Sequence, residues 1–206
     1  MSEGDFFGDE AKRETATSVK RVEASTSAEL VVAVRKRSGR YGVLAYHFGL
    51  GLAALVVGVL LISPTVYSVA SIAIEGILAF GLGVLLAANF DTILRRLSRP
   101  STIESNLHGA ARAAFFDLEI SRTSGRNGIL VYVSLFERRC VVLTDLGLDP
   151  AVLEPGWSAA KSEIENAVKH RNLPAFQRAL LSLGPVLGNL HPRLPDDVNE
   201  LPDEVQ

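Results

Sequence analysis

A fifty-residue stretch with one formal charge most strongly constrains how this 206-residue chain can fold. Between Tyr41 and Phe90 that charge is Glu75, and every other charged residue of the chain lies outside this stretch. Each element of a soluble domain needs polar residues for its wet face. The chain therefore joins an apolar part to a water-soluble part, which excludes a simple soluble globule and a wholly disordered chain.

Two runs within this stretch have the length of membrane-spanning helices. Residues 43–62 carry no formal charge, and as a helix they would be about 30 Å long. Residues 66–88 form the second run, interrupted only by Glu75. A proline in the link between them, Pro64, ends the first helix and can open the second. We expect a transmembrane helical hairpin over 43–90; two buried core helices are the alternative.

Basic residues on both sides of the hairpin predict its orientation. Positive charge stays on the cytoplasmic side of a membrane, and the connecting turn carries none. We therefore expect a protein of the inner (cytoplasmic) membrane, with both termini in the cytoplasm. The basic flanking residues are Arg35, Lys36, Arg37 and Arg40 before the first helix, and Arg95, Arg96 and Arg99 after the second.

Glu75 falls near the middle of the second apolar run, where a charge costs at least ~2.5 kcal/mol. One interpretation is a proton or ion relay, which would make the chain a small transporter or channel subunit. The other is a neutral acid hydrogen-bonded to a neighbouring helix, within the hairpin or in an oligomer. His47 differs from Glu75 in depth by about 9 Å, so a direct pair is not expected.

Small residues recur along both apolar runs and let helix backbones approach closely. They predict packing of the hairpin on itself, or a seam with other membrane proteins or with a second copy. These residues are Gly49, Ala53, Ala54 and Gly58 in the first run, and Gly76, Gly81 and Gly83 in the second.

The polar arms predict alternating helices and strands. Asp9 is placed to cap the first helix. The charged triplet 137–139 forms a tight turn between two strands, and a site for a phosphate or a lipid headgroup is the alternative for its arginines. Helices are expected over 9–24, 103–118, 157–170 and 173–190, and strands over 28–34, 128–135 and 140–144.

Neither arm offers enough apolar surface to fold alone. We therefore expect one α/β domain made from residues 1–42 and 91–191, interrupted by the hairpin. The strand at 28–34 pairs with the strand at 128–135. Residues 192–206 are rich in proline and acids and predict a disordered, solvated tail.

Several short motifs occur in order along the two arms: 26–32 (TSAELVV), 122–123 (RT), 126–135 (RNGILVYVSL), 137–139 (ERR), 145–148 (DLGL) and Trp157. Together they resemble the motifs of the TPM domain family, found in bacterial membrane proteins and plant thylakoid-lumen proteins. The resemblance implies an α/β/α sandwich with a central sheet. Some plant members are acid phosphatases, some members bind divalent cations, and most bacterial members have no established activity. Ala28 and Leu146 depart from the family pattern, which has glycine and a basic residue there.

Three residues form the candidate ligand or cation site. Asp145 ends a predicted strand, where α/β sheets place ligand-binding groups, or it bonds its own turn. Glu29 begins what we take as the neighbouring strand and could share a Ca²⁺ or Mg²⁺ ion with Asp145. Gly147 allows a positive φ in the turn.

No catalytic set is recognisable: the sequence lacks a nucleophile elbow, a P-loop and a histidine pair with metal spacing. The one cysteine, Cys140, is expected to be a buried, inert thiol. A net charge of −2 does not indicate nucleic-acid binding. We expect a membrane-anchored protein without enzymatic activity that acts in membrane-protein assembly, quality control or signalling. The alternative is a divalent-cation-dependent phosphatase.

Overall fold

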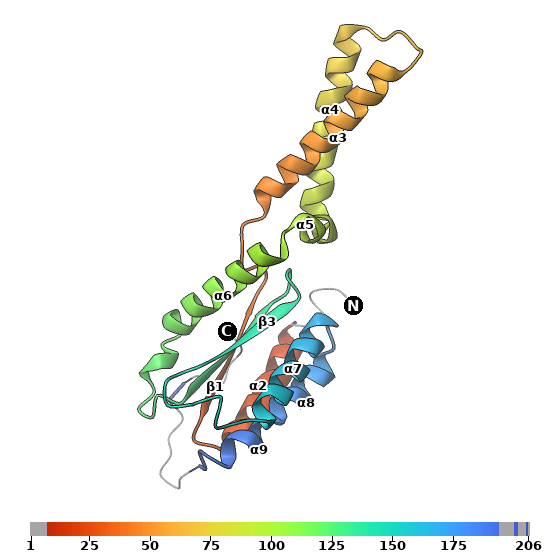
Figure 1. Cartoon of the computed structure of the whole chain (residues 1–206). Helices are drawn as coiled ribbons and strands as arrows, with labels where there is room; N and C mark the ends of the chain where they lie inside the picture. Colours follow the sequence, from red (N-terminus) through yellow and green to blue (C-terminus); the bar gives the residue numbers. More distant parts are fainter. Residues whose placement is uncertain (1–7, 194–199, 202–204, 206) are drawn as a thin grey trace. The chain divides into compact units, whose positions relative to one another are not determined.

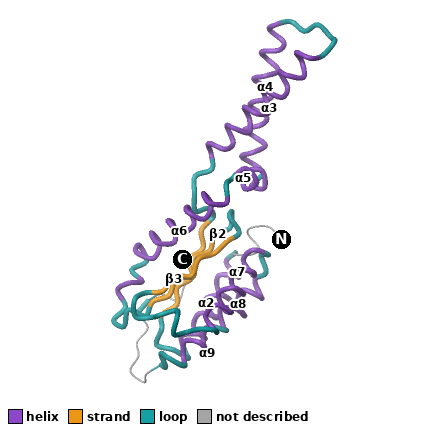
Figure 2. The backbone as a smooth tube through the Cα atoms, in the orientation of Figure 1, coloured by secondary structure: helices purple, strands orange, loops and turns teal. Residues whose placement is uncertain are grey.

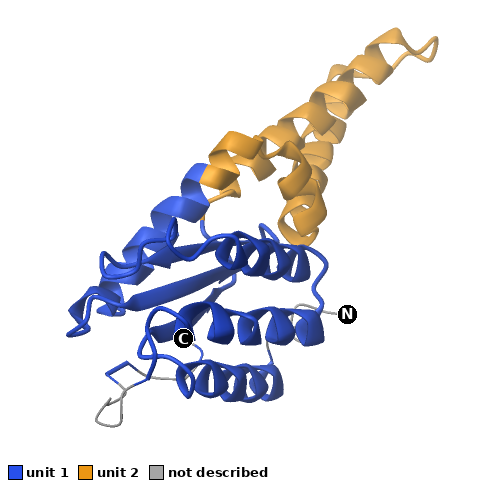
Figure 3. Cartoon of the chain, turned by 60° about the horizontal axis from the view of Figure 1, so that its bottom comes forward, with its two compact units in different colours: residues 1–38, 105–206 blue, residues 39–104 orange. Residues whose placement is uncertain are grey.

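The computed structural model describes residues 8–193, 200, 201 and 205. The chain divides into two compact units (Figure 3). One unit joins two segments far apart in sequence, 1–38 and 105–206. The other, 39–104, contains both apolar helices.

A three-stranded sheet forms the centre of the first unit, in the order β1-β2-β3. Its strands are β1 (Glu29–Arg35), β2 (Gly128–Ser134) and β3 (Arg139–Thr144). β1 runs parallel to β2 with Glu29 opposite Gly128, and β2 runs antiparallel to β3 with Ile129 opposite Thr144. The predicted pairing of the first strand with the second is therefore confirmed. Strand β2 is buried along its whole length, as its run of apolar residues requires.

Four helices from both ends of the chain cover one face of the sheet (Figures 1 and 2). They are α2 (Asp9–Glu23), α7 (Gly156–Lys169), α8 (Leu173–Leu181) and α9 (Leu183–Gly188). Alternate strand residues such as Leu30, Val32 and Val131 face them and share one apolar cluster with Val19, Ile164 and Phe176.

Two details of these helices differ from expectation. The cap of α2 is Gly8, without a side-chain bond, so Asp9 is the first helical residue and not the cap. The single helix predicted over 173–190 is wrong, because α8 ends at Leu181 and α9 begins at Leu183. Pro185 has no N–H to donate to the carbonyl four residues earlier, and this weakens the helix there.

The opposite face of the sheet lies against helix α6 (Pro100–Asp117) and the short 3₁₀ helix η1 (Ile120–Arg122). Leu107, Ala111 and Ala114 of α6 share a second apolar cluster with the strands. The strand residues of this cluster alternate with those of the first: Val31, Ala33, Leu130, Tyr132 and Val141. The sheet is thus buried on both faces.

The second unit consists of α3 (Gly42–Ile62), α4 (Val69–Asn89) and α5 (Asp91–Leu97). Helices α3 and α4 pack together where Gly49 meets Gly83: a Cβ on Gly83 would lie 2.7 Å from the Cα of Gly49. Gly58 and Gly81 have open space around them. Among the predicted small residues, this glycine pair permits the closest approach of the two helices.

The connection between α3 and α4 is longer than the three residues expected. Helix α4 begins at Val69 rather than at Val66, so Pro64 does not open it. Ser68 caps the helix instead, because its Oγ accepts a 3.1 Å hydrogen bond from the amide of Ser71. By length and composition, α3 and α4 are each able to cross a membrane.

Candidate functional site

Glu29, Gly128 and Asp145 lie at one end of the strands, where β1 and β2 begin and β3 ends. Glu29 is opposite Gly128 in the parallel pair, and the amide of Asp145 donates a 2.9 Å hydrogen bond to the Gly128 carbonyl. Paired residues point to the same face, so both carboxylates are on the side of α6. The strand that bears Glu29 is not the neighbour of β3, because β2 lies between them. The Cα atoms of Glu29 and Asp145 are therefore two strand spacings apart, about 9–10 Å.

Asp145 is held by Arg126. Arg126 Nε lies 2.8 Å from Oδ2 of Asp145, and Nη2 donates a 2.9 Å hydrogen bond to Oδ1. The same Oδ1 accepts a 2.8 Å bond from the amide of Leu146. Asp145 is buried and Arg126 is half exposed, so the guanidinium covers the carboxylate from the solvent side.

The loop before β2 places Arg126 over the sheet edge. Thr123 Oγ1 accepts a bond from the amide of Asn127, and the side-chain amide of Asn127 donates to the carbonyl of Ser27. Arg126 itself has a positive φ of 49°, which turns the chain there.

Gly147 packs directly against this loop. Its amide donates a 2.8 Å bond to the carbonyl of Arg126. A Cβ on Gly147 would lie 2.4 Å from the carbonyl oxygen of Gly125, so no larger residue fits. The expectation of a positive φ at Gly147 is wrong, because no described glycine has one. Close backbone approach is what requires glycine here.

Glu29 contacts the C-terminal segment of the chain. Its two carboxylate oxygens accept hydrogen bonds from the amides of Glu200 and Leu201, at 3.3 and 3.4 Å. Glu200 in turn accepts bonds from the amide and hydroxyl of Ser124. Most of the predicted acidic tail lies outside the described residues, but these two tail residues contact the domain.

Both carboxylates of the candidate site thus have partners from the protein itself. A cation at Asp145 would have to displace Arg126. The described part of the chain contains no group of three or more His, Cys, Asp or Glu side chains that could hold a metal ion. Two further acids of the loop that follows β3, Asp149 and Glu154, accept local hydrogen bonds from the amides of Ala151 and Ser158.

Another buried carboxylate, that of Glu137, lies at the other end of the strands. It is 4% exposed and accepts a 2.9 Å hydrogen bond from the amide of Ser38 and another from the Ser134 hydroxyl. The structure has the expected turn, over 135–138, but Glu137 is buried within it, whereas Arg139 is exposed. Sequence reasoning missed this residue because acids in hairpin turns are usually solvated.

The residues around Glu137 fix the segment that precedes α3. The amides of Leu135 and Phe136 donate to the carbonyls of Arg35 and Lys36, at 3.0 and 2.9 Å. The Arg37 guanidinium stacks 4.8 Å above the centre of the Phe136 ring. The Tyr132 hydroxyl lies 3.3 Å from Ser38 Oγ. Burial raises the pKa of Tyr132 above its usual value, and the bond to Ser38 partly offsets this.

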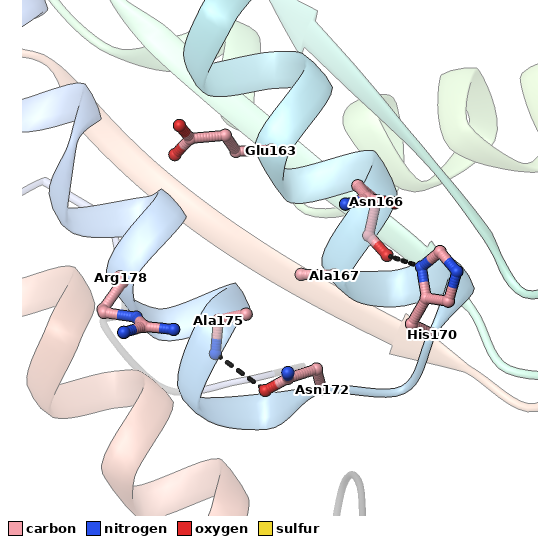
Figure 4. Close-up of a pocket in the computed structure, with 7 residues that line it drawn as sticks. All are labelled: Glu163, Asn166, Ala167, His170, Asn172, Ala175 and Arg178. Atoms are coloured by element: carbon pink, nitrogen blue, oxygen red, sulfur yellow. Dashed lines mark hydrogen bonds between the residues drawn. The ribbon is translucent and has the colours of Figure 1, made fainter.

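A pocket of about 470 Å³ lies between α7 and α8 (Figure 4). Two of its polar side chains make local hydrogen bonds at helix ends. His170 Nδ1 lies 2.9 Å from the Asn166 carbonyl at the end of α7, and Asn172 Oδ1 accepts a hydrogen bond from the Ala175 amide at the start of α8. Glu163 and Arg178 complete the polar lining, one from each helix. Nothing in this arrangement indicates a particular ligand.

Glu75 is exposed on α4, and no described residue gives it a hydrogen bond or an ion pair. His47 is bonded instead to the Val43 carbonyl, one turn earlier in α3. Cys140 is buried, as expected, and burial raises its pKa to about 12.

Fold and site together define a mixed α/β protein with two apolar helices long enough to cross a membrane. No family model matches the sequence, and no curated protein matches it. Among solved structures, the chain is similar to the NMR structure of the BA42 protein from the psychrophilic bacterium Bizionia argentinensis. The TM-score is 0.58 at 16% identity, covering 98% of this chain and 94% of that chain. At this identity the similarity shows the fold alone.

Proposed function

We propose that the chain is a membrane-anchored protein of the bacterial TPM type, in which a hairpin interrupts an α/β/α sandwich. It acts without enzymatic activity of its own in membrane-protein assembly, quality control or signalling. The observation that carries this proposal is the engagement of the candidate site by the protein itself. The carboxylate of Asp145 is paired with the Arg126 guanidinium, and the carboxylate of Glu29 accepts hydrogen bonds from the backbone amides of residues 200 and 201. Carboxylates that are already bonded within the protein are more typical of a structural or protein-binding surface than of an active site.

The location is part of the proposal. Helices α3 and α4 span the inner membrane, with both termini in the cytoplasm and the connection between the helices outside. The basic flanks and the uncharged connection support this orientation. The lipid bilayer is then the first partner of the chain, and other membrane proteins are the partners on which it acts.

Cysteine labelling tests the location in intact cells. In a Cys140→Ser background, Thr65→Cys is expected to react with a membrane-impermeant thiol reagent from outside, and Ser162→Cys is not. Ser162 is exposed on α7, so it would react if the domain were outside. Labelling of Ser162→Cys and not of Thr65→Cys would reverse the orientation.

A phosphatase assay tests the function against its main alternative. The purified full-length chain in detergent is incubated with a generic phosphomonoester and Mg²⁺ or Ca²⁺, and we expect no turnover. Turnover that disappears in Asp145→Asn, but persists in the surface variant Glu163→Gln, would overturn the proposal in favour of a cation-dependent phosphatase. If there is no turnover, cross-linking and pull-down from native membranes would identify the partner of the non-enzymatic protein.

Ion transport through Glu75 is the remaining alternative. It predicts proton or ion flux into liposomes that contain the purified chain, with the flux abolished in Glu75→Gln. We expect no flux above that of empty liposomes.

A further inference from the structure

We propose that two copies of this chain associate in the membrane through one face of α4, with the two Glu75 side chains in contact. This inference rests on the proposed insertion of the hairpin into a membrane. It goes beyond the proposed function, because it assigns an interaction surface and an occupant to it.

The first observation is the position of Glu75. Its side chain is exposed on α4, and it has no hydrogen bond or ion pair with any described residue. The hairpin itself therefore does not satisfy this acid. Glu75 is the seventh of the 21 residues of α4, and ionisable groups within a membrane-spanning helix face a protein partner rather than lipid. The polar partner of Glu75 must then come from another helix.

The second observation is a heptad pattern that passes through Glu75. Six residues of α4 follow one another at alternating intervals of four and three. A polar residue stands at each end of this series, Glu75 is the second member, and the other three are leucines. We call this set the Glu75 seam: Ser71, Glu75, Leu78, Leu82, Leu85 and Asn89. Alternation by four and three gives the 3.5-residue repeat of helices that pack along their length with knobs in holes.

The Glu75 seam is not used inside the hairpin. Helix α4 packs on α3 through a different face, whose buried residues are Ala79, Gly83 and Ala87. At 100° per residue, the seam lies about 120° around the helix from this face. Its three leucines remain 62%, 54% and 62% exposed, in chain order. One helix therefore carries two separate packing faces, one of glycine and alanine and one of leucine and glutamic acid.

A second copy of the chain fits this seam better than an unrelated helix does. Both copies insert in the same direction, so their α4 helices run parallel about a two-fold axis along the membrane normal. In a parallel pair each heptad position meets its own counterpart, so Glu75 faces Glu75. A neutral carboxyl group both donates and accepts hydrogen bonds, so two of them satisfy each other. An unrelated helix would have to bring a polar group to the same depth.

Disulfide cross-linking tests the geometry. The full-length chain carrying Cys140→Ser and Leu82→Cys is oxidised in native membranes and examined on non-reducing gels. We expect a dimer band at least ten times stronger than with Leu55→Cys. Leu55 is 63% exposed on α3 and lies outside the seam, so it is the matched control. Equal bands for the two variants, or a cross-link of Leu82→Cys only to a protein of different mass, would overturn the proposal.

Sedimentation equilibrium in detergent tests the chemistry. Glu75→Leu is expected to raise the dimer dissociation constant at least ten-fold. Glu75→Gln, which still donates and accepts, is expected to stay within about three-fold of the wild type. The double variant Leu78→Ala/Leu82→Ala should also dissociate, whereas Leu55→Ala/Val59→Ala on α3 should not. A monomeric wild type, or a dimer unchanged by Glu75→Leu, would refute the seam.

The two proposals fail in distinguishable ways. If Thr65→Cys labels from outside and the chain is monomeric, the membrane insertion stands and the dimer is wrong. If the labelling places the hairpin outside a membrane, the proposed location is wrong as well.

Discussion

Two nitrogen atoms of Arg126 contact the two carboxylate oxygens of Asp145, Nε to Oδ2 at 2.8 Å and Nη2 to Oδ1 at 2.9 Å. The two residues differ in environment, because Asp145 is 4% exposed and Arg126 is 49% exposed. Water screens the guanidinium but does not reach the carboxylate. The pair therefore matters chiefly because, without Arg126, a buried charge would be left uncompensated.

Arg126→Ala is expected to lower the free energy of unfolding by about 1–3 kcal/mol, the cost of an unsatisfied buried group. Urea unfolding in detergent, followed by the fluorescence of the single tryptophan, Trp157, measures this. Adding Asp145→Asn should recover part of the loss, because a neutral amide needs no counter-charge. The control is Arg122→Ala. The Arg122–Glu119 ion pair is exposed, so less than about 0.5 kcal/mol should be lost. Equal losses in the two variants would contradict this account.

Gly147→Ala is expected to destabilise the domain by about 2–3 kcal/mol, because overpacking a rigid site forces the backbone to move. The added Cβ would lie 2.4 Å from the Gly125 carbonyl oxygen. Gly109→Ala, in the exposed part of α6 with nothing within 4 Å, should instead stabilise by about 0.5–1 kcal/mol. Thermal melts of the two variants compare them directly. If Gly147→Ala leaves the melting temperature unchanged, the loop before β2 must move to make room for the added Cβ.

Glu137→Ala is expected to release the segment before α3. It removes the acceptor of the Ser38 amide and leaves that amide and the Ser134 hydroxyl without this partner, at about 1–3 kcal/mol. Limited trypsin digestion should then cleave after Lys36 or Arg37 several times faster than in the wild type. Glu163→Ala, on an exposed position of α7, should leave the cleavage rate unchanged. If both variants are cut at the wild-type rate, Glu137 does not hold this segment.

Cys140 is expected to resist alkylation in the folded chain. Burial, with a smaller contribution from the charge of Glu165, raises the pKa of its thiol to about 12. The reactive thiolate is then about a thousand times rarer at pH 8 than in an exposed thiol. Because Cys140 is the only cysteine, mass spectrometry reports its modification without interference. Rapid labelling at low denaturant would contradict the burial.

The same shift predicts a loss of stability at alkaline pH. Above about pH 9 the unfolded chain releases the thiol proton while the folded chain keeps it. The unfolded state then binds fewer protons, so the free energy of unfolding falls by up to ~1.4 kcal/mol per pH unit until about pH 12. Cys140→Ala lacks this contribution. Between pH 9 and 10.5 the wild type should therefore lose stability more steeply than Cys140→Ala, and parallel curves would be evidence against the shift.

The strands could be predicted from the sequence because they depend on local composition. Each strand is a run of β-branched and aliphatic residues, and burial on both faces requires such runs. The pairing of the first strand with the second followed from a different argument, that neither arm has enough apolar surface to fold alone. The break between α8 and α9 was missed because Leu183 and Leu187 continue the apolar pattern across it. The capping of α4 was missed because Val66 and Tyr67 are as apolar as the helix that follows.

The partners of the candidate residues could not be predicted, because they are distant in sequence. The position of Asp145 followed from its place between a strand and a glycine. Its partner Arg126 lies across the register of β2 and β3, which the sequence leaves open. The amides that bind Glu29 come from residues 200 and 201, and the amide that binds Glu137 comes from Ser38. Contacts of this kind depend on the folded arrangement and leave no local pattern.

The parallel pairing of β1 with β2 also imposes an order of events during synthesis. The ribosome finishes Glu29 about a hundred residues before its partner Gly128, and both apolar helices are made in between. At ~5–20 residues per second, β1 waits at least several seconds with its pairing edge bare. Both apolar helices emerge from the ribosome within that interval. Under the insertion proposed above, the membrane therefore receives the middle of the chain before the sheet can close. A nascent chain arrested before residue 128 should for this reason be a target for chaperones that bind open strand edges.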